Sequence, residues 1–376
     1  MARIAKISAL WVLLCIIHHR ESNQVGPGPR VARLWSTRVI GDLAGPEKPA
    51  ALFVNDENRA GLEFMDDQHL IVHEVDLDSK QLSSRENPLV SSSFQLRLSV
   101  FEAASGVQKA VGKWGTRPHQ AGVYRTSGGI LVRTASTLTQ VSEDLKELRK
   151  LSFPISNVSS LSLLSVSPSG NSILVNHYNQ VSSNFEVLEG TTLSLAISWN
   201  EQRPLRRLYT ISDKAIVAAD FNQQNILSTE FGAKKWATVA GKEKLGCVGL
   251  PTFIDDRHLV NACKRLSVID LDGNVVYEDR LAKEQVFGNK VAASVKGRWI
   301  AVAVKQISGS DFWDTGNVRI TGMQVFVYDL VARQRVLELA VQPVPQSDFD
   351  FALSPDGSKL ALLNDSIVSV YIVPPA

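Results

Sequence analysis

Two short apolar segments separated by a tight polar turn recur along this chain of 376 residues. The clearest copy runs from Leu353 to Leu362 and has its turn at Pro355-Asp356-Gly357. Six such turns, at residues 67, 128, 170, 256, 297 and 357, are separated by 61, 42, 86, 41 and 60 residues. A period of about 40 to 50 residues built from short strands is typical of a β-propeller, whose repeat is one four-stranded blade. The repeat therefore predicts an architecture, although an architecture alone does not define a function.

The interval of 86 residues spans two periods, so it contains one degenerate repeat. We expect this repeat between Leu208 and Gly246. A turn at 212–214 fits the spacing better, whereas a turn at 222–225 fits the strand pattern better. Either placement gives seven blades.

The last repeat stops at its third strand, near Val373, so its fourth strand must come from elsewhere. The segment Val31 to Ile40 alternates apolar and polar residues and precedes the first repeat. We expect it to pair there and close the ring, because closure removes exposed sheet edges. Ser142 to Leu148 has helical propensity, but its position in the repeat predicts a turn between third and fourth strands. The fold class is thus all-β, a single seven-bladed β-propeller over residues 31–376.

The copy Ser354-Pro355-Asp356-Gly357, followed by Leu360-Ala361, resembles the WD40-like repeat of bacterial propellers such as the TolB-type and YVTN-type proteins. Ser167 to Gly170 is a partial second copy, and the other turns depart from the pattern. The resemblance implies a propeller over most of residues 31–375 in a bacterial protein. It implies no catalytic residue.

Charge and motif content exclude several function classes. The chain has 40 basic and 38 acidic residues, so it lacks the excess of basic residues that is typical of nucleic-acid-binding proteins and of polybasic membrane-binding segments. Nucleophile elbows, phosphate-binding loops, dinucleotide fingerprints and haem-attachment motifs are absent from the sequence. We therefore expect no cofactor and no metal.

The N-terminus has the features of an export signal. Arg3 and Lys6 precede an apolar run of 11 residues, Ile7 to Ile17, which is too short to span a bilayer as a helix. Residues 1–22 are interpreted as a signal peptide or an uncleaved anchor, and 23–30 as a Gly/Pro linker. The protein is then periplasmic or secreted, and it contacts a membrane only if the segment stays attached.

Two cysteines, Cys247 and Cys263, lie beyond this segment and flank the same proposed hairpin. They would emerge at the same end of it, so they can form a disulfide in an exported chain. The alternative is that both remain unpaired small apolar residues.

The intervals of 61 and 60 residues imply insertions of about 18 residues in the first and sixth blades. They fall at Ser79 to Ser93 and Gln306 to Gly322, on one rim, where the third blade also has a long stretch, His177 to Thr191. Long loops on a rigid scaffold commonly carry binding sites. The candidate binding residues are Asp311, Phe312, Trp313, Asp314, Arg319, Arg85, Glu86 and His119. The alternative for the aromatic residues is that they anchor their loop.

Asp66-Asp67-x-His69 and Asp255-Asp256-x-His258 occupy the same turn in two blades, which favours a structural role over metal binding or catalysis. The sequence thus predicts an exported, non-enzymatic, monomeric scaffold. Its partner is an envelope or extracellular protein, or a small ligand, bound at the rim with the long loops. The alternative is a propeller hydrolase, lactonase or metal-dependent enzyme with its site at the central channel.

Overall fold

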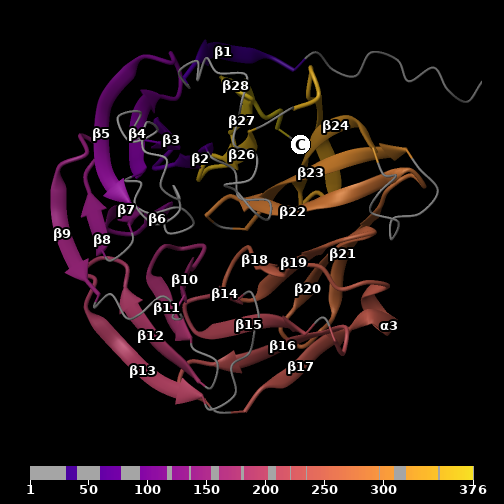
Figure 1. Ribbon diagram of the computed structural model, residues 1–376. Helices are drawn as coiled ribbons and strands as arrows, with labels where there is room; N and C mark the ends of the chain where they lie inside the picture. Colours follow the sequence, from indigo (N-terminus) through magenta and orange to yellow (C-terminus); the bar gives the residue numbers. More distant parts are fainter. Residues whose placement is uncertain are drawn as a thin grey trace, which may run out of the picture. The chain divides into compact units, whose positions relative to one another are not determined.

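The computed structural model describes residues 31–39, 60–77, 94–116, 121–134, 137–153, 161–178, 182–201, 209–220, 222–233, 235–295, 297–308, 319–345 and 348–375. Their strands form seven separate four-stranded antiparallel sheets, all within the compact unit Arg33–Ala376. Figure 1 shows these sheets arranged as a ring, with the first strand of each nearest the centre. The seven-bladed, all-β prediction is confirmed.

Six of the seven blades are runs of four consecutive strands along the chain. Blade 1 contains β2 (Ala60–Phe64), β3 (His69–Leu77), β4 (Phe94–Glu102) and β5 (Gln108–Thr116). Blade 2 contains β6 (Gly122–Thr126), β7 (Gly129–Arg133), β8 (Thr137–Val141) and β9 (Glu147–Ser152). Blade 3 contains β10 (Leu161–Val166), β11 (Ser172–Tyr178), β12 (Ser183–Glu189) and β13 (Leu195–Glu201).

Blade 4 contains β14 (Tyr209–Ile211), β15 (Ala215–Asp220), β16 (Asn225–Glu230) and β17 (Ala237–Gly241), followed by the short helix α3 (Lys242–Leu245). Blade 5 contains β18 (Thr252–Phe253), β19 (His258–Ala262), β20 (Arg265–Asp270) and β21 (Val275–Arg280). Blade 6 contains β22 (Gln285–Ala293), β23 (Trp299–Ser308), β24 (Arg319–Asp329) and β25 (Gln334–Ala340). Blade 7 contains β26 (Phe349–Leu353), β27 (Lys359–Asn364) and β28 (Ile367–Ile372).

The strand β1 (Arg33–Arg38) is the fourth strand of blade 7 and pairs antiparallel with β28. Trp35 lies opposite Val370, and its indole Nε1 donates a hydrogen bond to the Ala103 carbonyl at 2.8 Å. Because Ala103 belongs to blade 1, this strand contacts both blades that meet where the ring closes.

The hydrophobic core lies in layers between neighbouring blades. Between blades 7 and 1, for example, Leu62 and Phe64 pack with Leu363 and Val368, all of them at most 2% exposed. Second strands are buried on both faces, and all six residues of β15 are buried. Such strands are continuous apolar runs, whereas the outer strand β5 alternates between exposed and half-buried residues.

Three sequence predictions about the repeat can be compared with these strands. Blade 4 has its first turn at 212–214, between β14 and β15, so the spacing decided correctly between the two alternatives. Residues 142–146 form the predicted turn between β8 and β9. The predicted long connection from His177 to Thr191 is wrong, because β12 occupies most of it and only 179–182 join β11 to β12. Polar residues alternate with Phe185 and Val187 in this strand, so its sequence resembles that of a loop.

The blade 6 insertion is shorter than predicted. Gln306 pairs with Gly322 and Ser308 with Arg319, so both ends of the predicted loop belong to the ladder between β23 and β24. The connection itself comprises residues 309–318. Opposed polar residues at these positions lengthen the hairpin rather than the loop.

Candidate functional site

Most of the predicted binding residues lie outside the described residues: Arg85, Glu86, His119, Asp311, Phe312, Trp313 and Asp314. The exception is Arg319, the exposed first residue of β24. The predicted signal segment and linker, residues 1–30, lie outside as well. No helix within the described ranges is long and apolar enough to cross a membrane.

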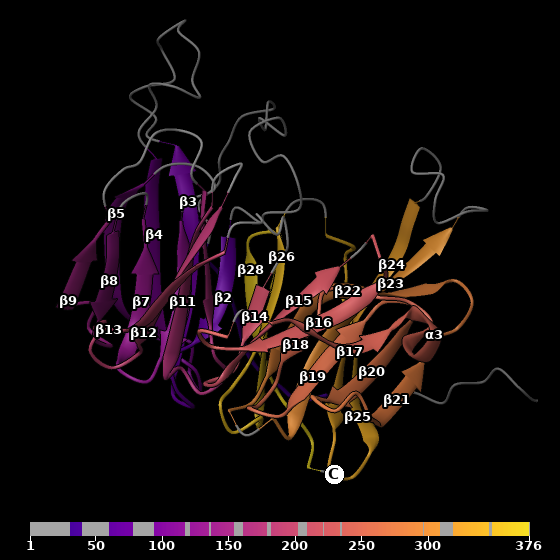
Figure 2. The same cartoon turned by 90° about the horizontal axis from the view of Figure 1, so that it is seen from below.

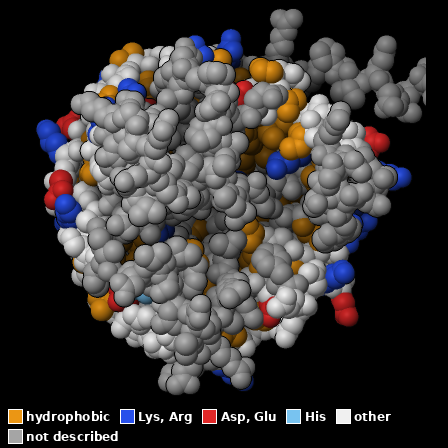
Figure 3. Space-filling view, in the orientation of Figure 1, with side chains coloured by type: hydrophobic (Ala, Val, Ile, Leu, Met, Phe, Trp, Pro, Cys, Tyr) orange, Lys and Arg blue, Asp and Glu red, His pale blue; other side chains and the backbone are white. Residues whose placement is uncertain are grey.

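The strands beside the two long connections distinguish blades 1 and 6 from the others. Residues 78–93 separate β3 from β4, and residues 309–318 separate β23 from β24. In the other five blades, two to four residues join the second strand to the third. The two hairpins extend toward the same side of the ring (Figure 2). The face shown in Figure 3 has basic and acidic side chains interspersed around its visible circumference, without a large patch of one sign.

A cluster of charged side chains connects the first strands of blades 6, 7 and 1 near the centre of the ring. Asp350 of β26 is 6% exposed, forms an ion pair with Lys290 of β22, and accepts the Leu62 backbone N–H of β2 at 2.8 Å. One carboxylate thereby joins three successive blades. Because it is buried and fully engaged, its first role is to hold these blades in register.

Two further titratable groups belong to this cluster. Burial raises the pKa of the Glu63 carboxyl, and Asp350 adds to the effect, while Arg125 and Lys290 oppose it. Burial lowers the pKa of His73 to about 4, so this imidazole is neutral at pH 7. Its Nδ1 atom is buried without a hydrogen-bond partner among the described residues. The ring fits beside Gly61, where a Cβ atom would lie 2.7 Å from His73 Nε2. Asp350 and Lys290 act electrostatically on both groups, so one cluster contains a carboxyl with a raised pKa and a neutral imidazole, which are groups that can carry acid–base chemistry.

The turn at Asp66 brings together the one group of potential metal ligands within the described ranges, Asp66, His69 and Glu143, whose atoms lie within 4.8 Å of one another. The Asp66 Oδ1 atom already accepts the backbone N–H groups of Gln68 and His69, both at 2.7 Å, and Asp66 Oδ2 lies 2.9 Å from His69 Nδ1. Burial acts to raise the pKa of Asp66, but these hydrogen bonds outweigh it and lower the pKa.

The same turn in blade 5 repeats this geometry without the third acid. Asp255 Oδ1 accepts the N–H groups of Arg257 and His258 at 2.7 Å, and Asp255 Oδ2 lies 2.8 Å from His258 Nδ1. Their second aspartates bond to the neighbouring blade: Asp67 accepts the Asp356 N–H at 2.8 Å, and Asp256 accepts the Asp213 N–H at 3.1 Å. The recurrence supports the structural interpretation of both turns.

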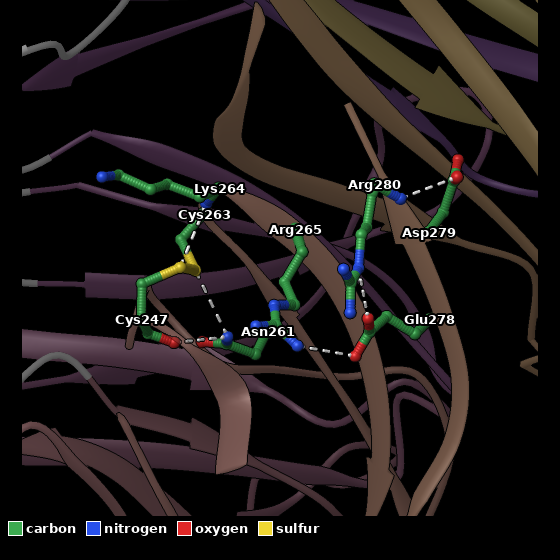
Figure 4. A network of polar contacts seen from close by, with 8 residues as sticks. All are labelled: Cys247, Asn261, Cys263, Lys264, Arg265, Glu278, Asp279 and Arg280. Carbon is green, nitrogen blue, oxygen red and sulfur yellow. Dashed lines mark hydrogen bonds and ion pairs between the residues drawn. A yellow bond between two sulfur atoms is a disulfide. The ribbon is translucent and has the colours of Figure 1, made fainter. Parts of the chain in front are cut away.

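Cys247 and Cys263 are joined by a disulfide in blade 5, with their Cα atoms 6.3 Å apart (Figure 4). The buried Asn261 supports the loop: its Nδ2 donates to the Cys247 carbonyl at 3.1 Å and its Oδ1 accepts the Gly249 N–H at 2.8 Å. The outer strand beside it carries Glu278, which forms ion pairs with Arg265 and Arg280.

Comparison with known proteins identifies the fold and nothing finer. No protein-family model matches the sequence, and none of the curated proteins does. Among solved structures, the Pan2 WD40 domain of Neurospora crassa is 13% identical, with a TM-score of 0.53 over 92% of this chain and 96% of that chain. A chain of a Mitotic Checkpoint Complex is 11% identical, with a TM-score of 0.53 over 93% of this chain and 98% of that chain. At such low identity the likeness shows a WD40-type β-propeller fold alone.

Proposed function

We propose that this chain is an exported, non-enzymatic, monomeric scaffold that binds a protein partner through the rim bearing the long connections of blades 1 and 6. The observation that carries the proposal is the contrast in connection length. The second and third strands are joined by residues 78–93 in blade 1 and by residues 309–318 in blade 6, but by only two to four residues in every other blade. Both connections begin on lengthened hairpins on the same side, one on each side of blade 7. Long loops on a rigid scaffold are a common form of binding site.

The test compares partner capture by the full tagged chain with capture by Phe312→Ala/Trp313→Ala. The matched control is Val331→Ser, a 74% exposed side chain in the turn between β24 and β25 of the same blade. A partner lost with the double variant and retained by the control supports the proposal. If all three folded proteins recover the same set of proteins, rim binding through these aromatic residues is rejected.

We propose export to the periplasm or the cell exterior on two grounds. The basic start and the apolar run at 7–17 have the pattern of a signal peptide, and the disulfide in blade 5 suits an oxidising compartment. The Ser-Pro-Asp-Gly turn at 354–357 supports a bacterial source. Mass spectrometry of the protein from its native host tests both grounds. A reduced cytosolic chain that retains its first residues contradicts the proposal.

A second candidate function is hydrolysis at the centre of the ring, because the cluster around Asp350 contains both Glu63, whose pKa is raised, and the neutral His73. The experiment is a survey of ester and lactone hydrolysis by the wild-type chain and by Glu63→Gln. Glu102→Gln, at the last residue of β4, is the control. Activity that disappears with Glu63→Gln alone supports an enzyme, whereas equal rates in all three proteins reject it.

A further inference from the structure

The junction between blades 3 and 4 contains a cluster of aromatic rings. Its members are Phe185, Trp199, Tyr209, Phe231 and Trp236. Phe185 is fully buried and stacks on Trp199 with ring centroids 5.0 Å apart, while Tyr209 meets it edge-on at 5.4 Å. The other four rings are half-buried. The cluster therefore extends from the core to the surface at the circumference, where β13 approaches β17 in Figure 1.

The Glu201 carboxylate lies at the outer end of this cluster. Glu201 is two residues after Trp199 on β13, and its two carboxylate oxygens accept the Trp236 Nε1–H at 3.2 and 3.3 Å. No Lys, Arg or His of the described chain forms an ion pair with it. Because a carboxylate offers about four acceptor positions, one indole N–H leaves most of them available.

Buried polar groups without partners lie on the same face of blade 3. Within the described residues, the Asn176 amide, the Ser183 hydroxyl and the Trp199 indole N–H form no hydrogen bond, and Asn176 and Ser183 are each 1% exposed. The register places Ser183 opposite Glu201, and it places Phe185 between Asn176 and Trp199. Buried polar groups are nearly always paired in folded proteins, so the unpaired acceptors in this place, Asn176 Oδ1 and Ser183 Oγ, indicate a missing donor.

The junction between blades 5 and 6 shows which partner such an arrangement takes. Its outer strand β21 carries Tyr277 and Asp279 at the same spacing as Trp199 and Glu201 on β13. There Arg335 of β25 donates to Asp279 with its Nη2 atom at 2.7 Å. The Arg335 guanidinium carbon lies 4.0 Å from the centre of the Phe326 ring. In this junction the aromatic rings and the acid hold a guanidinium group.

Among its described residues, blade 4 supplies no such group to Glu201. Both donors come from the beginning of the outer strand of the following blade: Arg335 is the second residue of β25, and Trp236 immediately precedes β17. Trp236 brings a single neutral N–H where Arg335 brings a charged fork of donors. Among the described side chains, the Glu201 carboxylate thus has a neutral donor but no cation.

We propose that the junction of blades 3 and 4 binds the guanidinium group of an arginine side chain from a protein partner. The guanidinium stacks on the half-buried faces of Trp199 and Trp236 and forms an ion pair with Glu201. One of its remaining N–H groups donates to the Ser183 hydroxyl opposite Glu201. This site lies at the end of blade 3 that carries the connection between β11 and β12, on the same side of the ring as the proposed rim, but none of its residues belongs to blades 1 or 6.

The test is a titration of the full chain with the peptide acetyl-Gly-Arg-Gly-amide, followed by tryptophan fluorescence. The matched ligand has citrulline in place of arginine, which keeps the shape and removes the charge. We expect the arginine peptide to bind about fivefold or more tightly than the citrulline peptide, the effect of one cation–π contact with its ion pair. Glu201→Gln should reduce arginine binding by a similar factor and leave citrulline binding unchanged.

Two further variants guard against misfolding and indirect effects. Glu186→Gln changes a carboxylate on the opposite face of the same sheet, where it faces His177, and should bind arginine as the wild type does. Trp236→Arg supplies a guanidinium from the chain itself and should abolish binding of the peptide. No binding of the arginine peptide by the folded wild type, or equal binding of the two peptides, overturns the proposal. Equal binding would point instead to a neutral polar ligand.

Discussion

The junctions of blades 3–4 and 5–6 contain the same kinds of side chain, but the acid of each junction receives different hydrogen-bond donors from the described residues. At 5–6 the acid Asp279 receives Arg335 at 2.7 Å and the Tyr328 hydroxyl at 2.8 Å. At 3–4 the acid Glu201 receives one indole N–H. The first junction satisfies its charges within the fold and adds to stability. The second keeps a carboxylate and aromatic faces available for another molecule.

The electrostatic consequences follow from this difference. Burial acts to raise the pKa of Asp279, but hydrogen bonds from Arg335 and Tyr328 outweigh it and lower the pKa. Burial raises the pKa of Tyr328, and its hydrogen bond to Asp279 adds to the effect. Arg335 therefore stays charged, Tyr328 stays neutral, and the network stays intact across the physiological range.

The largest expected effect concerns the disulfide between Cys247 and Cys263, which lies in blade 5. Replacing both Cys247 and Cys263 by serine should lower the free energy of unfolding by about 3 kcal/mol, the value for a loop of this size. Urea unfolding of oxidised wild type and variant measures the change. Reductant should lower the wild-type midpoint and leave the variant unaffected. Equal midpoints without reductant would show that the link contributes nothing.

Removing the internal cation should make the 5–6 junction resemble the 3–4 junction. Arg335→Met keeps the aliphatic stem but leaves Asp279 without its ion pair, and should cost about 2–3 kcal/mol of unfolding free energy. The two side chains are 26% and 23% exposed, so solvent screens part of the interaction. Arg280→Met, at 75% exposure, is the control and should change stability by less than about 0.5 kcal/mol. Equal effects of the two substitutions would contradict the assignment.

Tyr328→Phe removes the second donor to Asp279 and keeps the ring. We expect a loss of about 1.5 kcal/mol, at the lower end of the range for a hydrogen bond with a charged partner, because Arg335 still bonds to Asp279. A double-mutant cycle with Arg335→Met should show coupling, because both side chains bond to the same oxygen, Asp279 Oδ2. Strict additivity would mean that the two donors act independently.

The pH dependence of stability should also differ between the junctions. Because the pKa of Asp279 is lower in the folded protein than in the unfolded chain, its contribution is fully present above the unfolded value of about 3.9 and is lost as the pH falls through the folded value. Asp279→Asn should therefore flatten the decline of the urea midpoint in acid. An unchanged acid slope would refute this assignment.

The smallest expected effect is that of Glu201→Gln in the absence of a ligand. A half-buried carboxylate with one neutral donor and no cation should contribute within about 0.5 kcal/mol of unfolding free energy. Urea unfolding of Glu201→Gln and of Asp279→Asn compares the loss of unfolding free energy in the two variants. A smaller loss for Glu201→Gln distinguishes an acid that binds a ligand from one that stabilises the fold. A large loss for Glu201→Gln would instead assign this acid to stability.

The repeat was predictable because its signals are local. Turn residues at a fixed interval located the blades, and the interval alone placed the degenerate turn at 212–214. The third strand of blade 3 was missed, since Asn184 and Glu186 alternate with buried residues and resemble loop composition. The binding residues proposed from the sequence lie mostly outside the described residues and remain predictions. An aromatic residue two positions before an acid, at Trp199 and at Tyr277, marks both junctions in the sequence.

The sequence by itself determined the number of blades, the hairpin turns and the cysteine pair flanking one hairpin, because each depends on residues close together in the chain. Only the tertiary structure decided which acid has a cation. Glu201 and Trp236 are 35 residues apart, and Asp279 and Arg335 are 56 apart. Whether such residues meet depends on the twist of each blade and its packing against the next. The spacing of residues within one strand cannot show which side chain of the neighbouring blade contacts the acid on that strand.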